Sequence, residues 1–219
     1  MKKTVSSILM VLVVLSLPAS SLLFGIGGGR TYNSIIAGDN YRAYSYPGSF
    51  EWKTGLPVTV ECTSHFGFET GLSLTGKAYF VEREASGVKT TDIEERNVFL
   101  TVPLSLRVSL KWVDNVSIFF SLGGYAGWYL GGARSGSVLS LDSAPVSVSD
   151  SVDMVYRNRY AYGVTASLGY TADISNLRFS LSLGYSLDLS DMHREQTFHS
   201  YPIHNSTFDI SAGLQWRVR

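Results

Sequence analysis

The sequence predicts an all-β fold, an eight-stranded antiparallel up-and-down barrel, on three observations. Apolar residues alternate strictly with small or polar ones over long segments, most clearly in LRFSLSLGYSLDLS at 177–190, which is typical of strands with one apolar face. The connections between these segments are alternately long and short. Charged residues make up only 16% of the chain, whereas a fully solvated surface usually carries about 25–35%.

A cleavable signal peptide is predicted at residues 1–21, before a barrel domain at 22–219. Lys2 and Lys3 precede an apolar core that runs from Ile8 to Leu17 and is followed by a proline and small residues. This order is typical of secretory signals and favours cleavage after Ser21. The alternative, a membrane anchor, needs about 20 apolar residues, which this core does not provide.

The first three strands of the domain are predicted at 23–35, 49–62 and 67–80. The first is rich in glycine, which weakens a strand and loosens its register. The second ends at Cys62, the single cysteine of the chain. One cysteine excludes a disulfide framework within the chain.

The next two strands, 97–112 and 115–130, form a predicted hairpin around the tight turn at Asp114 and Asn115. Three further strands follow at 159–172, 177–190 and 208–219. The short turn DISN joins the first two of these, and an even number of strands results.

Long connections are expected at 37–48, 83–95, 134–156 and 191–206, and short ones near His65, at 114–115 and at 173–176. Outer-membrane barrels have short turns on the periplasmic side and long loops outside, so both chain ends are expected on the periplasmic side. For the loop at 134–156, two alternatives stay open. It either extends its flanking strands as an exposed β-ribbon, which offers edges to partners, or forms a serine-rich loop without regular structure.

The apolar face is expected to meet lipid, because no segment after the signal is long and apolar enough for a helical span and only a closed barrel could then cross a membrane. The opposite face is dominated by serine and glycine, which suit the narrow lumen of eight strands. Charges of both signs on that face are expected to pair across the lumen and escape the cost of burial. This predicted lumen charge network is Glu51, Lys53, Glu61, Glu69, Lys77, Arg107, Lys111, Arg178, Asp188, Asp209 and Arg217.

Aromatic side chains are expected in two girdles, one at each membrane interface. Trp112 and Trp216 fall at the short-turn ends of their strands, and Trp52 and Trp128 at the long-loop ends. The full predicted set is Trp52, Trp112, Trp128, Tyr160, Tyr162, Tyr170 and Trp216. The fold class is therefore an eight-stranded antiparallel up-and-down transmembrane β-barrel.

Four segments, GFETGLSLTGKAYF, NVFLTVPLSLRVSL, SLGGYAGWYLGG and LSLGYSLDLSD, resemble successive strands of the outer membrane protein β-barrel domain family, in the group called PorT-like. They are also similar to the small OmpX, OmpW and OmpA-type barrels. The resemblance covers nearly the whole domain and implies an outer-membrane location in a diderm bacterium. The chain departs from it at the C-terminus, which ends in Trp216-Arg217-Val218-Arg219 rather than phenylalanine.

No catalytic or nucleotide-binding motif is present in the sequence, so neither an enzyme nor a cofactor is expected. His193, His199 and His204 are weak candidates for a metal site, since imidazole suits zinc or copper but their spacing fits no standard motif. A lipid-modifying hydrolase with a serine and a histidine base is the alternative enzyme.

The leading expectation is a monomeric, non-enzymatic barrel with a closed lumen, whose long loops bind an extracellular protein or host ligand. Its other partners are outer-membrane lipid and the barrel-assembly machinery; balanced charge gives no reason to expect nucleic acid. The alternatives are a narrow channel or lateral path for small hydrophobic molecules, and a soluble lipocalin-like binder, which shares the alternation but turns the apolar face inward.

Overall fold

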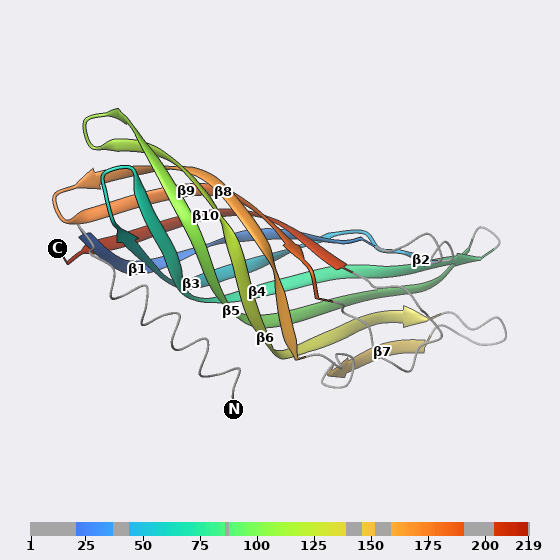
Figure 1. The fold of residues 1–219 in the computed structure, drawn as a ribbon. Helices are drawn as coiled ribbons and strands as arrows, with labels where there is room; N and C mark the ends of the chain where they lie inside the picture. Colours follow the sequence, from blue (N-terminus) through green and yellow to red (C-terminus); the bar gives the residue numbers. More distant parts are fainter. Residues whose placement is uncertain are drawn as a thin grey trace.

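Eight antiparallel strands pair edge to edge into a closed ring (Figure 1). The structure, a computed structural model, describes residues 21–36, 44–85, 88–138, 146–151, 159–190 and 204–218. Around the ring the strands are β1 (Ser21–Ile36), β3 (Ser49–Glu61), β4 (Phe66–Ala85), β5 (Val88–Val113), β6 (Val116–Val138), β8 (Tyr160–Ile174), β9 (Leu177–Asp188) and β10 (His204–Arg217). Pairing of β1 with β10 closes the ring, so the predicted eight-stranded barrel is confirmed.

Short turns join the strands at one end of the barrel, at 62–65, 114–115 and 175–176. Asn115 and Ser175 adopt positive φ angles of 67° and 56°, which are common for turn residues and suit tight hairpins. We call this the short-turn end. Cys62 lies in the first of these turns rather than in the strand that the sequence predicted, and it is a free thiol.

At the opposite end, β4, β5 and β6 continue well beyond the ring as a ribbon (Figure 1). The prediction of a long loop at 83–95 was therefore wrong, because the β4–β5 ladder continues to Ala85 and Val88. Two short strands join this extension: β7 (Val146–Ser151) pairs with β6, and β2 (Tyr44–Ser45) with β4. Of the two alternatives for 134–156, the ribbon holds for the described part, whereas 139–145 and 152–158 lie outside it.

The two faces of the wall differ as the alternation predicts. In β9, Leu181 and Leu183 are about half exposed on the outer surface, while Arg178 is buried inside. The outer surface carries a continuous set of exposed leucine, isoleucine, valine and aromatic side chains, and the buried interior is mostly threonine, serine, asparagine and charged residues. The barrel is thus apolar outside and polar inside.

The predicted signal peptide lies outside the described residues, except that Ser21 is the first residue of β1. No described helix is long and apolar enough to cross a membrane.

The closing contact between β1 and β10 depends on glycine at position 29. A Cβ atom there would lie 1.9 Å from the carbonyl oxygen of Ile210, while a Cβ at Gly27 on the same strand would lie 3.3 Å from the nearest atom. At Gly29 the backbones of β1 and β10 are so close that no residue with a Cβ atom fits.

We therefore expect Gly29→Ala to prevent or strongly destabilise closure of the barrel, and Gly27→Ala to be tolerated with a small shift. The measurement is the gel mobility of boiled and unboiled samples, with thermal melting of the folded band. Equal melting temperatures for the two variants would show that β1 and β10 do not pair in this register.

Candidate functional site

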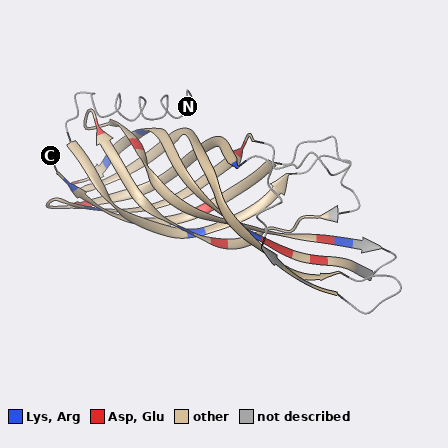
Figure 2. Ribbon diagram, turned by 90° about the horizontal axis from the view of Figure 1, so that it is seen from below, with Lys and Arg blue, Asp and Glu red and all other residues tan. Residues whose placement is uncertain are grey.

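The lumen is the candidate functional site, because charged side chains from almost every strand of the ring meet inside it. Figure 2 shows acidic and basic residues distributed along the strands of the barrel and along the ribbon extension. Alternation places every second side chain of each strand in this narrow space. The ion pairs form distinct groups along the barrel axis.

One group lies near the short turns and consists of Glu61, Asp173, Arg178 and Arg217, here called the short-turn cluster. Arg178 donates two hydrogen bonds to Asp173, of 2.7 and 2.9 Å, and a third to Glu61. The Arg217 guanidinium lies 3.1 Å from Asp173 and 3.6 Å from Glu61. Since Glu61 is on β3 and Arg178 on β9, this cluster crosses the lumen.

A second group, here called the central pair, is Lys77 on β4 and Asp188 on β9. The Lys77 ammonium lies 2.7 and 2.8 Å from the two carboxylate oxygens, and the side chains are only 3% and 2% exposed. The hydroxyl of Tyr125 also donates to Asp188. The ammonium lies over the rings of Phe99 and Tyr125, at 5.1 and 5.5 Å from their centroids, which adds cation–π attraction. β4 and β9 stand on opposite sides of the ring, so the central pair also spans the lumen.

Two further pairs lie along the wall between these groups. Arg107 bonds Glu69, and its guanidinium stacks 3.7 Å from the centre of the Phe119 ring. Lys53 lies 3.2 Å from Asp209. Opposite charges are therefore matched locally, as buried charges require.

The ion pairs continue into the ribbon. Arg134 on β6 and the hydroxyl of Tyr79 on β4 both donate to Glu95 on β5. Arg96 lies 3.7 Å from Glu51 and 3.0 Å from Glu94.

Of the charges predicted in the lumen, the structure brings ten into these groups and leaves one apart. Lys111 is 65% exposed beside the turn, where it pairs with the exposed Asp114 at 3.1 Å. Its position in the last residues of β5 puts it beyond the enclosed part of the barrel. The prediction of Lys111 as a lumen residue was therefore wrong.

The sequence reasoning missed other interior residues. Asp173 was assigned to a turn and Glu95 to a loop, although both take part in the groups above. Aromatic rings inside the lumen were missed as well: Phe99, Phe119, Tyr125 and Tyr129. A signal was present, because glycines face these rings: a Cβ at Gly169 would lie 2.8 Å from Phe119, and one at Gly163 would lie 2.7 Å from the Tyr125 hydroxyl.

The residues predicted as girdles all lie exposed on the outer surface. These are Trp52, Trp112, Trp128, Tyr160, Tyr162, Tyr170 and Trp216. Trp128 packs edge-on against Tyr160, with ring centres 5.0 Å apart.

The weak metal candidates are not brought together within the described residues. His193 and His199 lie outside them, and His204 is the first residue of β10. The described part of the chain contains no group of three His, Cys, Asp or Glu side chains that could hold a metal ion. His65, in the first short turn, contacts the backbone carbonyl of Ser109 at 3.1 Å.

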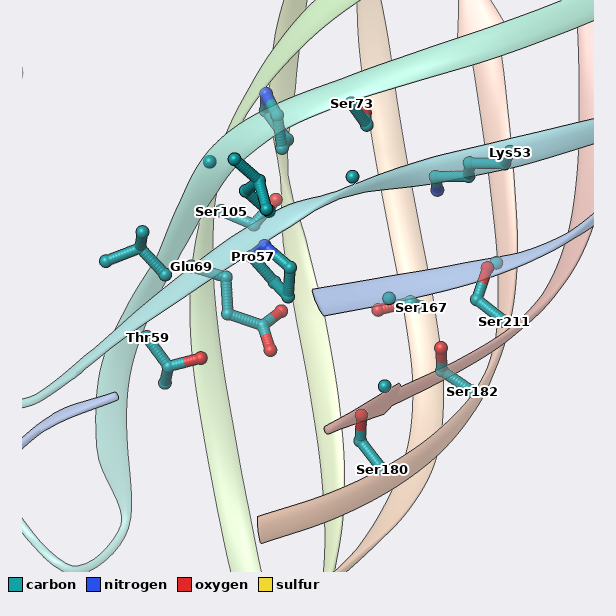
Figure 3. Close-up of a pocket in the computed structure, with 18 of the residues that line it drawn as sticks. Lys53, Pro57, Thr59, Glu69, Ser73, Ser105, Ser167, Ser180, Ser182 and Ser211 are labelled. Atoms are coloured by element: carbon teal, nitrogen blue, oxygen red, sulfur yellow. The ribbon is translucent and has the colours of Figure 1, made fainter. Parts of the chain in front are cut away.

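Between the central pair and the short-turn cluster the lumen holds a cavity of about 200 Å³ (Figure 3). Lys53, Thr59, Glu69, Ser105, Ser167, Ser180, Ser182 and Ser211 face it from several strands. The space is thus lined by hydroxyl groups together with glycines and apolar residues, and its charged residues already have partners.

Breaking the central pair should be far more costly than breaking the exposed pair at the turn. We expect Lys77→Met to lower the free energy of unfolding by about 3–5 kcal/mol, because a buried carboxylate loses its counter-charge. The double variant Lys77→Met, Asp188→Leu should recover most of that loss, because the unpaired charge is removed as well. Lys111→Met, the matched control, should have no measurable effect. Urea unfolding in lipid vesicles measures the free energy of unfolding of each variant. Equal effects of Lys77→Met and Lys111→Met would contradict the assigned burial.

The fold is shared by barrels of known structure. OprG from Pseudomonas aeruginosa superposes with a TM-score of 0.50 at 13% identity, covering 93% of this chain and 98% of that chain. Two more distant matches are Ail of Yersinia pestis in complex with the heparin analogue sucrose octasulfate (TM-score 0.41, 14% identity, 89% and 99% covered) and the outer membrane protease OmpT of Escherichia coli (0.47, 10%, 92% and 98%). No curated protein sequence matches the chain.

The family described as outer membrane protein beta-barrel domain matches residues 16–194. This bears out the predicted barrel family and its location in the outer membrane of a Gram-negative bacterium, without resolving the PorT-like group within it. With most of its length matched and its strands closed into an eight-membered ring, the chain belongs to the outer membrane protein beta-barrel domain family.

Proposed function

We propose that this protein is a non-enzymatic, monomeric barrel with a closed lumen, which presents its ribbon to a partner outside the cell. One observation supports this best: the strands stay hydrogen-bonded far beyond the ring, whereas the lumen below them is crossed by paired charges at two levels. The ribbon comprises residues 79–85, 88–97, 132–138 and 146–151.

Closure of the lumen is supported by where the ion pairs lie. The central pair and the short-turn cluster each join strands from different sides of the ring, at two levels. Eight strands leave an interior just wide enough for side chains to fill. Ions would have to separate both groups to pass, so the alternative of a channel is disfavoured.

The ribbon is suited to recognition because it is ordered yet has open edges. Within the described residues β7 pairs only with β6, so its other edge is free to add a strand from a partner. Its backbone is held in place by the β4–β5–β6 ladders that rise from the barrel. A rigid scaffold that presents surface segments is a common arrangement for binding.

In this proposal the short-turn end faces the periplasm and the ribbon faces outward, as in other outer-membrane barrels. Insertion depends on the barrel-assembly machinery, and the surrounding lipid contacts the exposed apolar wall. The aromatic girdles set the depth of the barrel in the bilayer.

The purified wild-type protein should be electrically silent in planar bilayers. A variant with Lys77, Asp188, Arg178 and Glu61 all replaced by serine should conduct ions if it still shows the heat-dependent gel shift of a folded barrel, because the Lys77–Asp188 and Arg178–Glu61 pairs that span the lumen are removed. Steady conductance by the wild type would contradict a closed lumen.

An epitope tag inserted between Ser86 and Gly87 should bind antibody on intact cells, because the neighbouring residues Ala85 and Val88 form the last pair of the β4–β5 ladder in the ribbon. The matched control is the same tag between Asp114 and Asn115, which should be reached only after the outer membrane is permeabilised. The reverse pattern would show that the barrel has the opposite orientation.

A further inference from the structure

One arginine, Arg30 on β1, points outward from the apolar wall of the barrel and is exposed. It follows the alternation of β1, in which Phe24, Ile26 and Tyr32 are exposed on the outer face while Thr31 is fully buried inside. Below the ribbon, the outward-facing positions of the described ring strands hold no other Lys, Arg, Asp or Glu residue. A cation that faces lipid is costly, so its position calls for a partner that offsets the cost.

The guanidinium of Arg30 has no such partner in the described part of the chain. Its side chain makes no hydrogen bond, ion pair or ring contact there. By contrast, the arginines of the lumen, Arg107, Arg178 and Arg217, each contact a carboxylate. The outward arginine therefore keeps all its donors for a group outside the chain.

The height of Arg30 on the wall is in the half nearest the ribbon. Along β1 it is six positions beyond Phe24, which pairs with Trp216 near the short turns. Six residues span about 20 Å of strand, or about 15 Å along the barrel axis at a tilt of about 40°. The apolar band of such barrels is about 25 Å tall. A long cationic side chain at this height can extend to the polar interface on the ribbon side.

Aromatic side chains mark that interface beside Arg30. Trp52 on β3 and Ile210 on β10 stand directly opposite the arginine in the two ladders. Tyr32, two positions farther along β1, packs against Phe50 with ring centres 5.0 Å apart. Tryptophan and tyrosine gather at the headgroup level of a bilayer. The arginine thus lies next to the layer in which lipid headgroups are found.

The outer face just below Arg30, toward the short turns, is made of small residues. Gly28 pairs with Thr54 on one side and with Ala212 on the other, and all three share the face of Arg30. Thr54 and Ala212 are exposed, and the Thr54 hydroxyl donates to the carbonyl of Gly27 at 3.2 Å. Small side chains leave room for an acyl chain to lie against the wall below the guanidinium.

The chemistry of an outward arginine at this depth favours a phosphate. Arginine presents a planar fork of N–H donors that matches phosphate oxygens, and such charge-assisted hydrogen bonds are stronger than neutral ones. In a lipid with a phosphorylated head, the phosphate is close to the acyl chains and so lies at the boundary that Arg30 reaches. A head with a net negative charge complements the single unpaired cation, whereas a zwitterionic head brings a cation of its own.

We propose that Arg30 binds the phosphate group of an anionic, phosphate-bearing lipid in the leaflet on the ribbon side. Trp52 and Tyr32 flank the headgroup, and one acyl chain lies over the small residues around Gly28. This site is on the outer wall and separate from the ribbon edge and the lumen, so it does not depend on the proposed surface function.

The test uses tryptophan fluorescence in lipid vesicles, because Trp52 stands opposite Arg30. The triple variant Trp112→Phe, Trp128→Phe, Trp216→Phe keeps Trp52 as its one tryptophan, which bromine on lipid acyl chains quenches. In phosphatidylcholine vesicles, brominated phosphatidic acid should reach half-maximal quenching at a mole fraction about tenfold lower than brominated phosphatidylcholine does, since one charge-assisted contact suffices for that ratio. Similar quenching by the two brominated lipids would overturn the proposal.

Two substitutions in that variant separate a site from general attraction to the protein. Arg30→Gln should abolish the preference for phosphatidic acid, because the side chain stays polar but loses its charge. Arg159→Gln, which removes another exposed arginine, is the matched control and should leave the preference unchanged. An undiminished preference after Arg30→Gln would overturn the proposal.

A second tryptophan keeps the proposal testable even if Arg30→Gln fails to give the heat-dependent gel shift of a folded barrel. A variant that retains Trp216 alone, near the short turns, should be quenched equally by the two brominated lipids, because no unpaired outward cation lies beside it among the described residues. A preference for phosphatidic acid at Trp216 as large as that at Trp52 would overturn the proposal.

Discussion

The need to pair every backbone N–H and C=O group within lipid is the constraint on which the rest of this structure depends. No water is available in the hydrocarbon region, so a strand there must have a neighbour on each side. The β1–β10 ladder, from Leu23↔Arg217 to Ile36↔His204, satisfies this by closing the ring. Closure at eight strands then fixes the width of the lumen, and a narrow lumen forces its charged side chains into contact with one another.

Pairing of charges follows from that width. A buried ion recovers its lost hydration only through close partners, and the groups around Asp188 and Arg178 each supply several. Aromatic rings fill the remaining volume, and they fit because glycine stands opposite them at positions 163 and 169. Beside Pro57 and Pro103 the interior is not filled, and the cavity lies there.

The period-two pattern was enough to predict the barrel, its strand number and the face of nearly every charged residue. It was sufficient because side chains alternate between the two faces of a strand. A slip of β9 by one residue, for example, would turn all its leucines inward. The pattern did not predict the ribbon at 83–95, since charged residues such as Asp92 and Glu94 occupy the outer face there and remove the contrast between faces. Nor could it reveal which charges meet across the ring. Lys77 and Asp188 are 111 residues apart in the sequence, and their contact depends on how the strands between them are staggered.

The central claim is that apolar side chains of the strands face lipid and the polar ones face a closed interior. Spin-label accessibility along β9 tests it most directly. With the sole cysteine removed by Cys62→Ser, single cysteines from 179 to 186 are labelled in turn in lipid vesicles, and collisions with oxygen and with a water-soluble nickel complex are compared. We predict that odd positions are accessible to oxygen and shielded from nickel, with a period of two, while even positions are shielded from both. Accessibility of the odd positions to nickel would place the leucines against water and contradict the account.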